Sequence, residues 1–200
     1  MGCSNPHPHC QVWALNKLVG EPYKEMVSFE MFSEQNNQKC LLCEYTRVEL
    51  LNEQHDAKNR VFYKNASFVA IVPFWAVWPF ELLIVSRKHL ASIAEITSPT
   101  IAPESHGGPT VLDDFSDILL VVNRTYDKLF SCIFPFSMGI HQSPTLNDPK
   151  MDLFHFHMHF YPPLLRGKNV KKFLVGFELL AEPQRDITVE SAAKTLRSLL

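Results

Sequence analysis

The chain has 200 residues, of which 46% are hydrophobic and 20% charged, with a formal net charge of −2 at pH 7. This length suffices for one domain with a sizeable core, and the small net charge excludes the basic field that nucleic acids or acidic membranes would attract. Five irregularly spaced cysteines argue against a disulfide framework and no signal peptide opens the chain, so we expect a cytoplasmic protein.

Apolar residues at helical spacing, or in short β-branched runs, predict the following elements. In chain order these are a strand at 11–14, helices at 21–35 and 45–52, strands at 60–63, 67–72 and 80–86, a helix capped by Asp113 or Asp114, strands at 137–141, 153–161 and 173–179, and a helix capped by Thr188. Because strands and helices come in blocks, we predict an α+β fold with a mainly antiparallel sheet.

One stretch, 68–85, is apolar except for Glu81 and has the length of a membrane span. It contains Pro73 and Pro79 and is rich in β-branched and aromatic residues. Two buried strands joined at the prolines explain this composition better than a spanning helix, so we expect no membrane partner.

Histidines occupy alternate positions at His155, His157 and His159, beside bulky apolar residues. Alternate side chains of a strand share one face, so these three imidazoles line one side. Imidazole is the commonest metal ligand and titrates near neutrality, which indicates a metal site or catalysis. The alternative is the exposed polar face of an edge strand.

The same alternation occurs at His7 and His9, as two related strands in two copies of one module would show. A neutral imidazole can carry a phosphoryl or nucleotidyl group as a covalent intermediate. The preceding Gly, Cys, Ser and Asn at 2–5 can offer amides and hydroxyls to phosphate oxygens. Spacing alone only suggests this chemistry.

Five segments in order resemble motifs of the galactose-1-phosphate uridylyltransferases, a family of the histidine-triad superfamily. They are 1–14, 72–80, 134–139, 157–166 and 172–186. The likeness implies a histidine-triad-like fold, with 1–20 ending an N-terminal half-domain that carries the nucleophile and 21–200 forming the C-terminal domain. The family's proteins are longer, and the matched segment begins about midway through them.

The resemblance also implies the reaction, in which UMP passes from UDP-glucose to galactose 1-phosphate through a uridylyl-histidine, within a homodimer. His9 matches the nucleophile, and Gln11 matches the glutamine that hydrogen-bonds the phosphate of that intermediate. Residues that match other nucleotide, hexose and phosphate contacts are Gly2, Cys3, Ser4, Lys172, Phe173, Val175, Phe177, Glu178 and Gln184. Phe177 stands where the family has a tyrosine, so one hydroxyl is missing.

A structural zinc or iron site is implied by the match of Glu25, His141, His157 and His159 to four family ligands. His7 matches a position that binds a second zinc in some members, together with side chains of the first half. His155 matches no ligand and is interpreted as a surface or supporting histidine. The CxxC at 40–43 is interpreted as packing in a turn before a helix, and His89 as structural.

Two alternatives remain open at this point. Another histidine-triad transferase or hydrolase would share the nucleophile but not the sugar-binding stretch 172–184. A non-catalytic fragment or pseudoenzyme would keep the fold and the metal but lack turnover.

Overall fold

The computed structural model describes residues 7, 9, 10, 12–97, 108–133, 136–144, 151–162, 181, 182, 185 and 187–200. Among these residues, no helix combines the length and the apolar character that crossing a bilayer requires.

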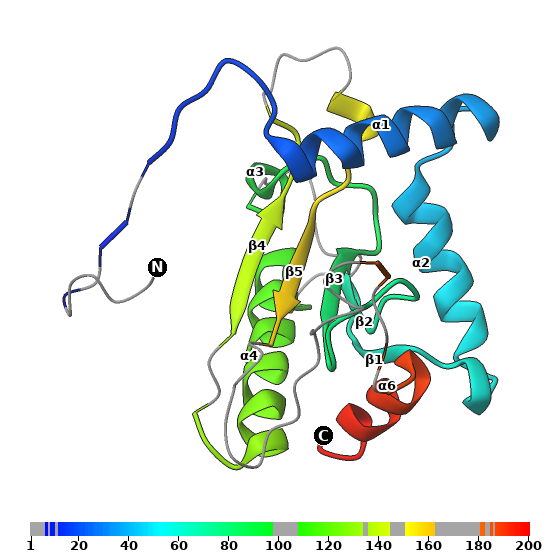
Figure 1. The fold of residues 1–200 in the computed structure, drawn as a ribbon, viewed down its shortest axis with the longest axis vertical. Coiled ribbons are helices and arrows are strands. Elements are labelled where there is room, and N and C mark those ends of the chain that lie inside the picture. Colours follow the sequence, from blue (N-terminus) through cyan, green and yellow to red (C-terminus); the bar gives the residue numbers. More distant parts are fainter. Residues whose placement is uncertain are drawn as a thin grey trace.

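A five-stranded antiparallel sheet, in the order β1-β2-β3-β5-β4, forms the centre of the fold (Figure 1). The strands are β1 Val61–Lys64, β2 Phe68–Ile71, β3 Leu82–Ser86, β4 Ser137–His141 and β5 His157–Tyr161. β2 and β3 are buried along their whole length, as the apolar stretch 68–85 predicts for two core strands. The one charged residue of the stretch 68–85, Glu81, accepts hydrogen bonds from the backbone N–H groups of Val77 and Trp78.

Helices cover both faces of the sheet. The longer helices are α1 Gly20–Gln35, α2 Leu41–Asn52, α4 Val111–Phe130 and α6 Val189–Arg197, and the short ones are α3 Ile93–Ile96, η1 Asp56–Lys58 and η2 Met151–Leu153. Side chains of α4 and α6 pack against alternate residues of the strands, such as Phe68, Ile84 and Met158. The residues between these, such as Val69 and Val85, face α1 and α2. The α+β fold with an antiparallel sheet is therefore confirmed.

Several predicted elements differ from the structure, among them the helix predicted at 45–52, which begins at Leu41. The cap of α4 is Thr110 rather than Asp113 or Asp114, because Thr110 and Asp113 bond each other's backbone N–H groups in a capping box. Residues 12–14 form no strand and are exposed. β5 begins at His157 rather than at 153, because the Phe156 N–H bonds the Leu90 carbonyl oxygen instead of a neighbouring strand. The strand predicted at 173–179 lies outside the described residues.

Candidate functional site

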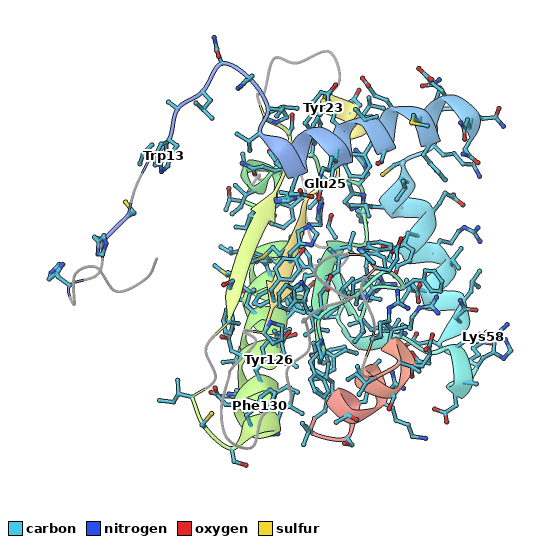
Figure 2. The ribbon with its side chains drawn as sticks, viewed as in Figure 1. Trp13, Tyr23, Glu25, Lys58, Tyr126 and Phe130 are labelled. Atoms are coloured by element: carbon cyan, nitrogen blue, oxygen red, sulfur yellow. The ribbon has the colours of Figure 1, made fainter. Side chains whose placement is uncertain are left out.

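Four side chains converge between α1, on which Figure 2 labels Glu25, and the paired strands β4 and β5. Glu25 comes from α1, His141 from β4, and His157 and His159 from β5. Nδ1 of His141 lies 2.7 Å from Oε2 of Glu25. The Nε2 atoms of His157 and His159 lie 3.5 and 3.3 Å from Oε1 of Glu25. One ligand-type atom of each residue lies within 4.8 Å of the others, and we call this group the Glu25 cluster.

The donor set of the Glu25 cluster suits a metal ion. Three imidazoles and one carboxylate are a combination that zinc accepts, and tetrahedral bonds of about 2.0–2.1 Å place ligand atoms about 3.3 Å apart. The Nδ1–H of His157 donates to the His155 carbonyl oxygen at 2.7 Å, which leaves Nε2 unprotonated toward the cluster when the ring is neutral. Nε2 of His159 is buried and makes no hydrogen bond in the described residues, although it contacts Glu25.

The protonation states in the Glu25 cluster also suit a metal ion. Burial is the largest single effect on the Glu25 carboxyl and opposes its ionisation. The hydrogen bond from His141 and the close imidazoles of His157 and His159 together outweigh burial, so the pKa of Glu25 is lowered below its usual range. Burial lowers the pKa of His159, which favours the neutral imidazole that a metal needs. The carboxylate and this imidazole are thus held in the protonation states of ligands.

The histidines of the first segment, His7 and His9, are both exposed. The chain leads toward them from α1 along a segment that leaves the body of the domain past Trp13, which is 79% exposed (Figure 2). The Nδ1–H of His9 donates to the His7 carbonyl oxygen at 2.9 Å. His157 makes the same kind of bond, from its Nδ1–H to the carbonyl oxygen of His155, two residues earlier. The two histidine segments therefore share this local geometry as well as the alternation of histidines.

Most of the expected substrate contacts lie outside the described residues. They are Gly2, Cys3, Ser4, Gln11, Lys172, Phe173, Val175, Phe177, Glu178 and Gln184. Their roles stay predictions.

A second group of metal-type side chains was not predicted from the sequence. It consists of Cys40, Cys43, His89 and His155, with their ligand-type atoms again within 4.8 Å of one another. The interpretation of His155 as a surface residue is wrong, because it is only 1% exposed and its ring contacts both cysteine sulfurs. The one local signal was the CxxC, which by itself is weak.

The model of the family "Galactose-1-phosphate uridyl transferase, C-terminal domain" matches residues 24–200. Among the curated relatives, the galactose-1-phosphate uridylyltransferase of Hypocrea jecorina is 44% identical over 199 residues, which are 99% of this chain and 48% of that protein. The one from Saccharomyces cerevisiae is 46% identical over 201 residues, covering 100% of this chain and 50% of that protein. The chain thus spans about half the length of the curated relatives it matches.

Solved structures support the fold. A uridylyltransferase structure aligns with a TM-score of 0.74 at 24% identity, covering 99% of this chain and 56% of that chain. An ADP-glucose phosphorylase from Arabidopsis thaliana with bound ADP-glucose aligns with a TM-score of 0.63 at 20% identity, covering 90% and 50%. Because the family model matches nearly the whole chain, the chain belongs to the galactose-1-phosphate uridyl transferase family, whose C-terminal domain it matches.

Proposed function

We propose that the chain is part of a UDP-glucose–hexose-1-phosphate uridylyltransferase, which moves UMP from UDP-glucose to galactose 1-phosphate. The observation that carries this proposal is the identity of 44–46% with curated galactose-1-phosphate uridylyltransferases along the chain. We further propose that residues 1–20 belong to a preceding half-domain and 21–200 to the C-terminal domain. The enzyme would act in the cytoplasm as a homodimer.

His9 is the proposed nucleophile. Its Nδ1–H donates to the His7 carbonyl oxygen, so in the neutral ring Nε2 is the unprotonated nitrogen that would attack phosphorus. Nε2 would attack the α-phosphorus of UDP-glucose as the bond to the glucose 1-phosphate oxygen breaks. A phosphate oxygen of galactose 1-phosphate would then attack the same phosphorus, breaking the P–N bond and releasing UDP-galactose. Gln11 would donate a hydrogen bond to the transferred phosphate.

The remaining substrate contacts are proposed from the family motifs. Gly2, Cys3 and Ser4 would lie beside the nucleotide phosphates. The residues proposed around the hexose and its phosphate are Lys172, Phe173, Val175, Phe177, Glu178 and Gln184. Phe177 provides no hydroxyl, so one sugar contact of the family's tyrosine would be absent.

The Glu25 cluster is proposed to hold one zinc or iron ion. All four positions would be filled by protein atoms, so the ion would have a structural role, connecting α1 with β4 and β5. The buried Nε2 of His159, which no hydrogen bond satisfies in the described residues, supports this assignment. His7 would contribute to a further metal site together with side chains of the preceding half.

The nucleophile can be tested in a chimera that places the first half of the Saccharomyces cerevisiae relative in front of this chain. Incubation with UDP-glucose alone should add one uridylyl group to the protein, seen by mass spectrometry, and galactose 1-phosphate should remove it. His9→Gly should abolish the adduct, while the His55→Ala variant should keep it, because His55 is an exposed histidine just before η1. An adduct that forms equally in the His9→Gly chimera contradicts the assignment.

The Glu25 cluster needs a separate measurement. His157→Ala should remove one metal ion per chain, measured by mass spectrometry of the purified protein, because one of four ligands is lost. His55→Ala is again the matched control and should keep the full metal content. Unchanged metal content and thermal stability in His157→Ala would show that this cluster holds no ion.

A further inference from the structure

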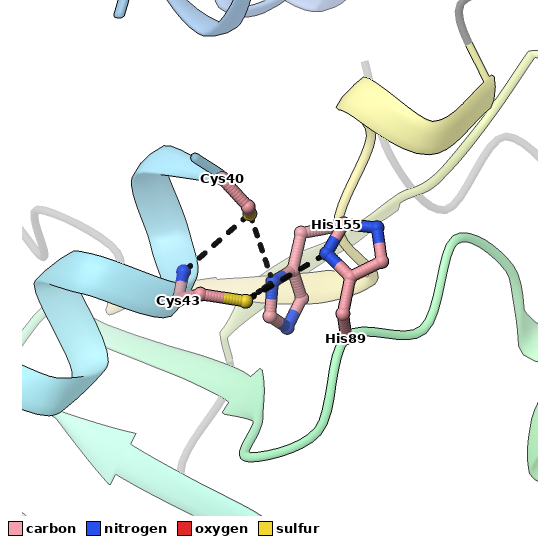
Figure 3. A group of neighbouring side chains, drawn as sticks. All are labelled: Cys40, Cys43, His89 and His155. Atoms are coloured by element: carbon pink, nitrogen blue, oxygen red, sulfur yellow. Dashed lines mark hydrogen bonds between the residues drawn. The ribbon is translucent and has the colours of Figure 1, made fainter. Parts of the chain in front are cut away.

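A group of two thiols and two imidazoles lies where the N-terminus of α2 meets the ends of β3 and β5 (Figure 3). It consists of Cys40, Cys43, His89 and His155, which we call the Cys40 cluster. We propose that the Cys40 cluster is a second metal site, which binds a structural Zn²⁺ ion through two thiolates and two imidazoles. It is distinct from the Glu25 cluster.

The spacing of the ligand atoms agrees with tetrahedral zinc. Zinc–sulfur bonds of about 2.3 Å and zinc–nitrogen bonds of about 2.0–2.1 Å place sulfur and nitrogen about 3.6 Å apart in a tetrahedron. Nδ1 of His155 lies 3.4 Å from the Sγ atoms of both Cys40 and Cys43. Nδ1 of His89 lies 3.7 Å from Sγ of Cys43. Three sulfur–nitrogen distances therefore already have the required length.

His155 is oriented as a metal ligand. Its Nε2–H donates to the Ser86 carbonyl oxygen at 2.8 Å, so Nδ1 is unprotonated in the neutral ring and faces both sulfurs. Metal-binding histidines usually hold their second ring nitrogen in this way. His155 is only 1% exposed, and its Nδ1 contacts the sulfurs of both cysteines. The His89 ring packs edge to face against the His155 ring, with the two ring centroids 5.0 Å apart.

One of the two thiols, that of Cys40, lies where its thiolate is favoured. Cys40 is the N-cap of α2, and the Cys43 backbone N–H donates to its Sγ at 3.5 Å. Helix N-termini stabilise thiolates, which are the form that binds zinc. A cavity of about 360 Å³ borders Cys40, Cys43 and His89, so an ion can reach the cluster from solvent.

The Cys40 and Glu25 clusters each take a histidine from the same segment, His155 and His157, but the two histidines direct different ring nitrogens at their clusters. His155 directs Nδ1 at the sulfurs, whereas His157 directs Nε2 at Glu25 and uses Nδ1 to bond the His155 carbonyl oxygen. One ion would join α2 to β3 and the segment before β5, and the other would join α1 to β4 and β5.

A redox-active dithiol is the alternative use of a CxxC. A dithiol needs no imidazole on either sulfur, whereas here two rings present Nδ1 to the thiols, one of them fully buried. Both thiols are free in the structure. These contacts favour the metal over the disulfide.

Cobalt absorption tests the site without any variant. The reduced 200-residue chain, saturated with Co²⁺, should show an intense thiolate-to-cobalt charge-transfer band in the near ultraviolet. The Glu25 cluster contains no sulfur and cannot produce this band, so the result does not depend on the proposed function. Absence of the band in the cobalt-saturated, reduced chain would overturn the proposal. A chain that forms a Cys40–Cys43 disulfide when oxidised and takes up no metal when reduced would overturn it as well.

Variants then locate the band. Cys40→Ser with Cys43→Ser should abolish it, and His155→Gln should weaken zinc affinity at least about tenfold in competition with a chelator. His157→Ala should keep the band. Cys132→Ser is the matched control, because Cys132 is an exposed free cysteine. A band that survives in the Cys40→Ser, Cys43→Ser double variant, or that Cys132→Ser abolishes, would show that other sulfurs bind the cobalt.

Discussion

Replacing Glu49 by glutamine should destabilise the domain strongly, because this carboxylate compensates a largely buried arginine. Glu49 of α2 has no exposed side-chain surface, and the Arg60 side chain is 12% exposed. Nε and Nη2 of Arg60 donate to the Glu49 carboxylate at 3.1 and 2.7 Å, while Nη1 donates to Glu190 of α6 at 3.0 Å. Removing one partner of a buried pair costs about 3–5 kcal/mol, since a charge stays buried without compensation.

Glu190 remains available to Arg60 in the variant, so we expect the lower end of that range, a loss of about 3 kcal/mol. For a domain of this size such a loss corresponds to a fall in Tm of about 6–12 °C. Urea unfolding followed by circular dichroism measures it as a lower midpoint at unchanged slope. The control is Glu21→Gln, which removes an exposed pair with Lys24 and should leave the midpoint unchanged. A loss below about 1 kcal/mol for Glu49→Gln would refute the reasoning.

Three further outcomes are expected. Tyr126→Phe should cost about 1–3 kcal/mol, because the fully buried hydroxyl donates to the Phe80 carbonyl oxygen at 2.8 Å; unchanged urea stability would contradict this. Thr110→Ala should cost about 1 kcal/mol in the same assay through loss of the α4 capping box, and Thr110→Ser should restore it. The 200 residues alone should form UDP-galactose at less than about a tenth of the rate of a full-length relative, because His9 lies on an exposed segment where positioning is lost. A rate within about tenfold would show that the chain is self-sufficient.

The sheet could be predicted well from the sequence, since its signal is local. The apolar run 68–85, interrupted by prolines, predicts two buried strands, and β2 and β3 are neighbouring interior strands of the sheet. Helix ends are harder. Thr110 caps α4 through a reciprocal bond with Asp113, and either residue is a good cap by type, so only the geometry decides which one precedes the first turn.

The two clusters show what local patterns miss. Alternation places His157 and His159 on one face, but Glu25 joins them from a helix more than 130 residues earlier, and only the family resemblance predicted that contact. The Cys40 cluster combines a CxxC with two histidines that lie 46 and 112 residues beyond Cys43. No periodicity connects positions so far apart. The order of strands in the sheet and the place of α2 bring them together.

Both clusters, and the Glu49–Arg60 pair, involve α1 or α2 rather than α4. The apolar core explains this distribution. Among the described residues, α1 and α2 contribute two buried apolar side chains to their face, Phe29 and Leu42, whereas α4 and α6 contribute eight to the other. Burial of apolar surface therefore holds α4 and α6 more strongly than α1 and α2, whose other apolar contacts come from partly buried side chains such as Met26 and Leu50. Directed polar contacts add to the positioning of α1 and α2, and ligand-type residues on these helices can act as such contacts when a metal is bound.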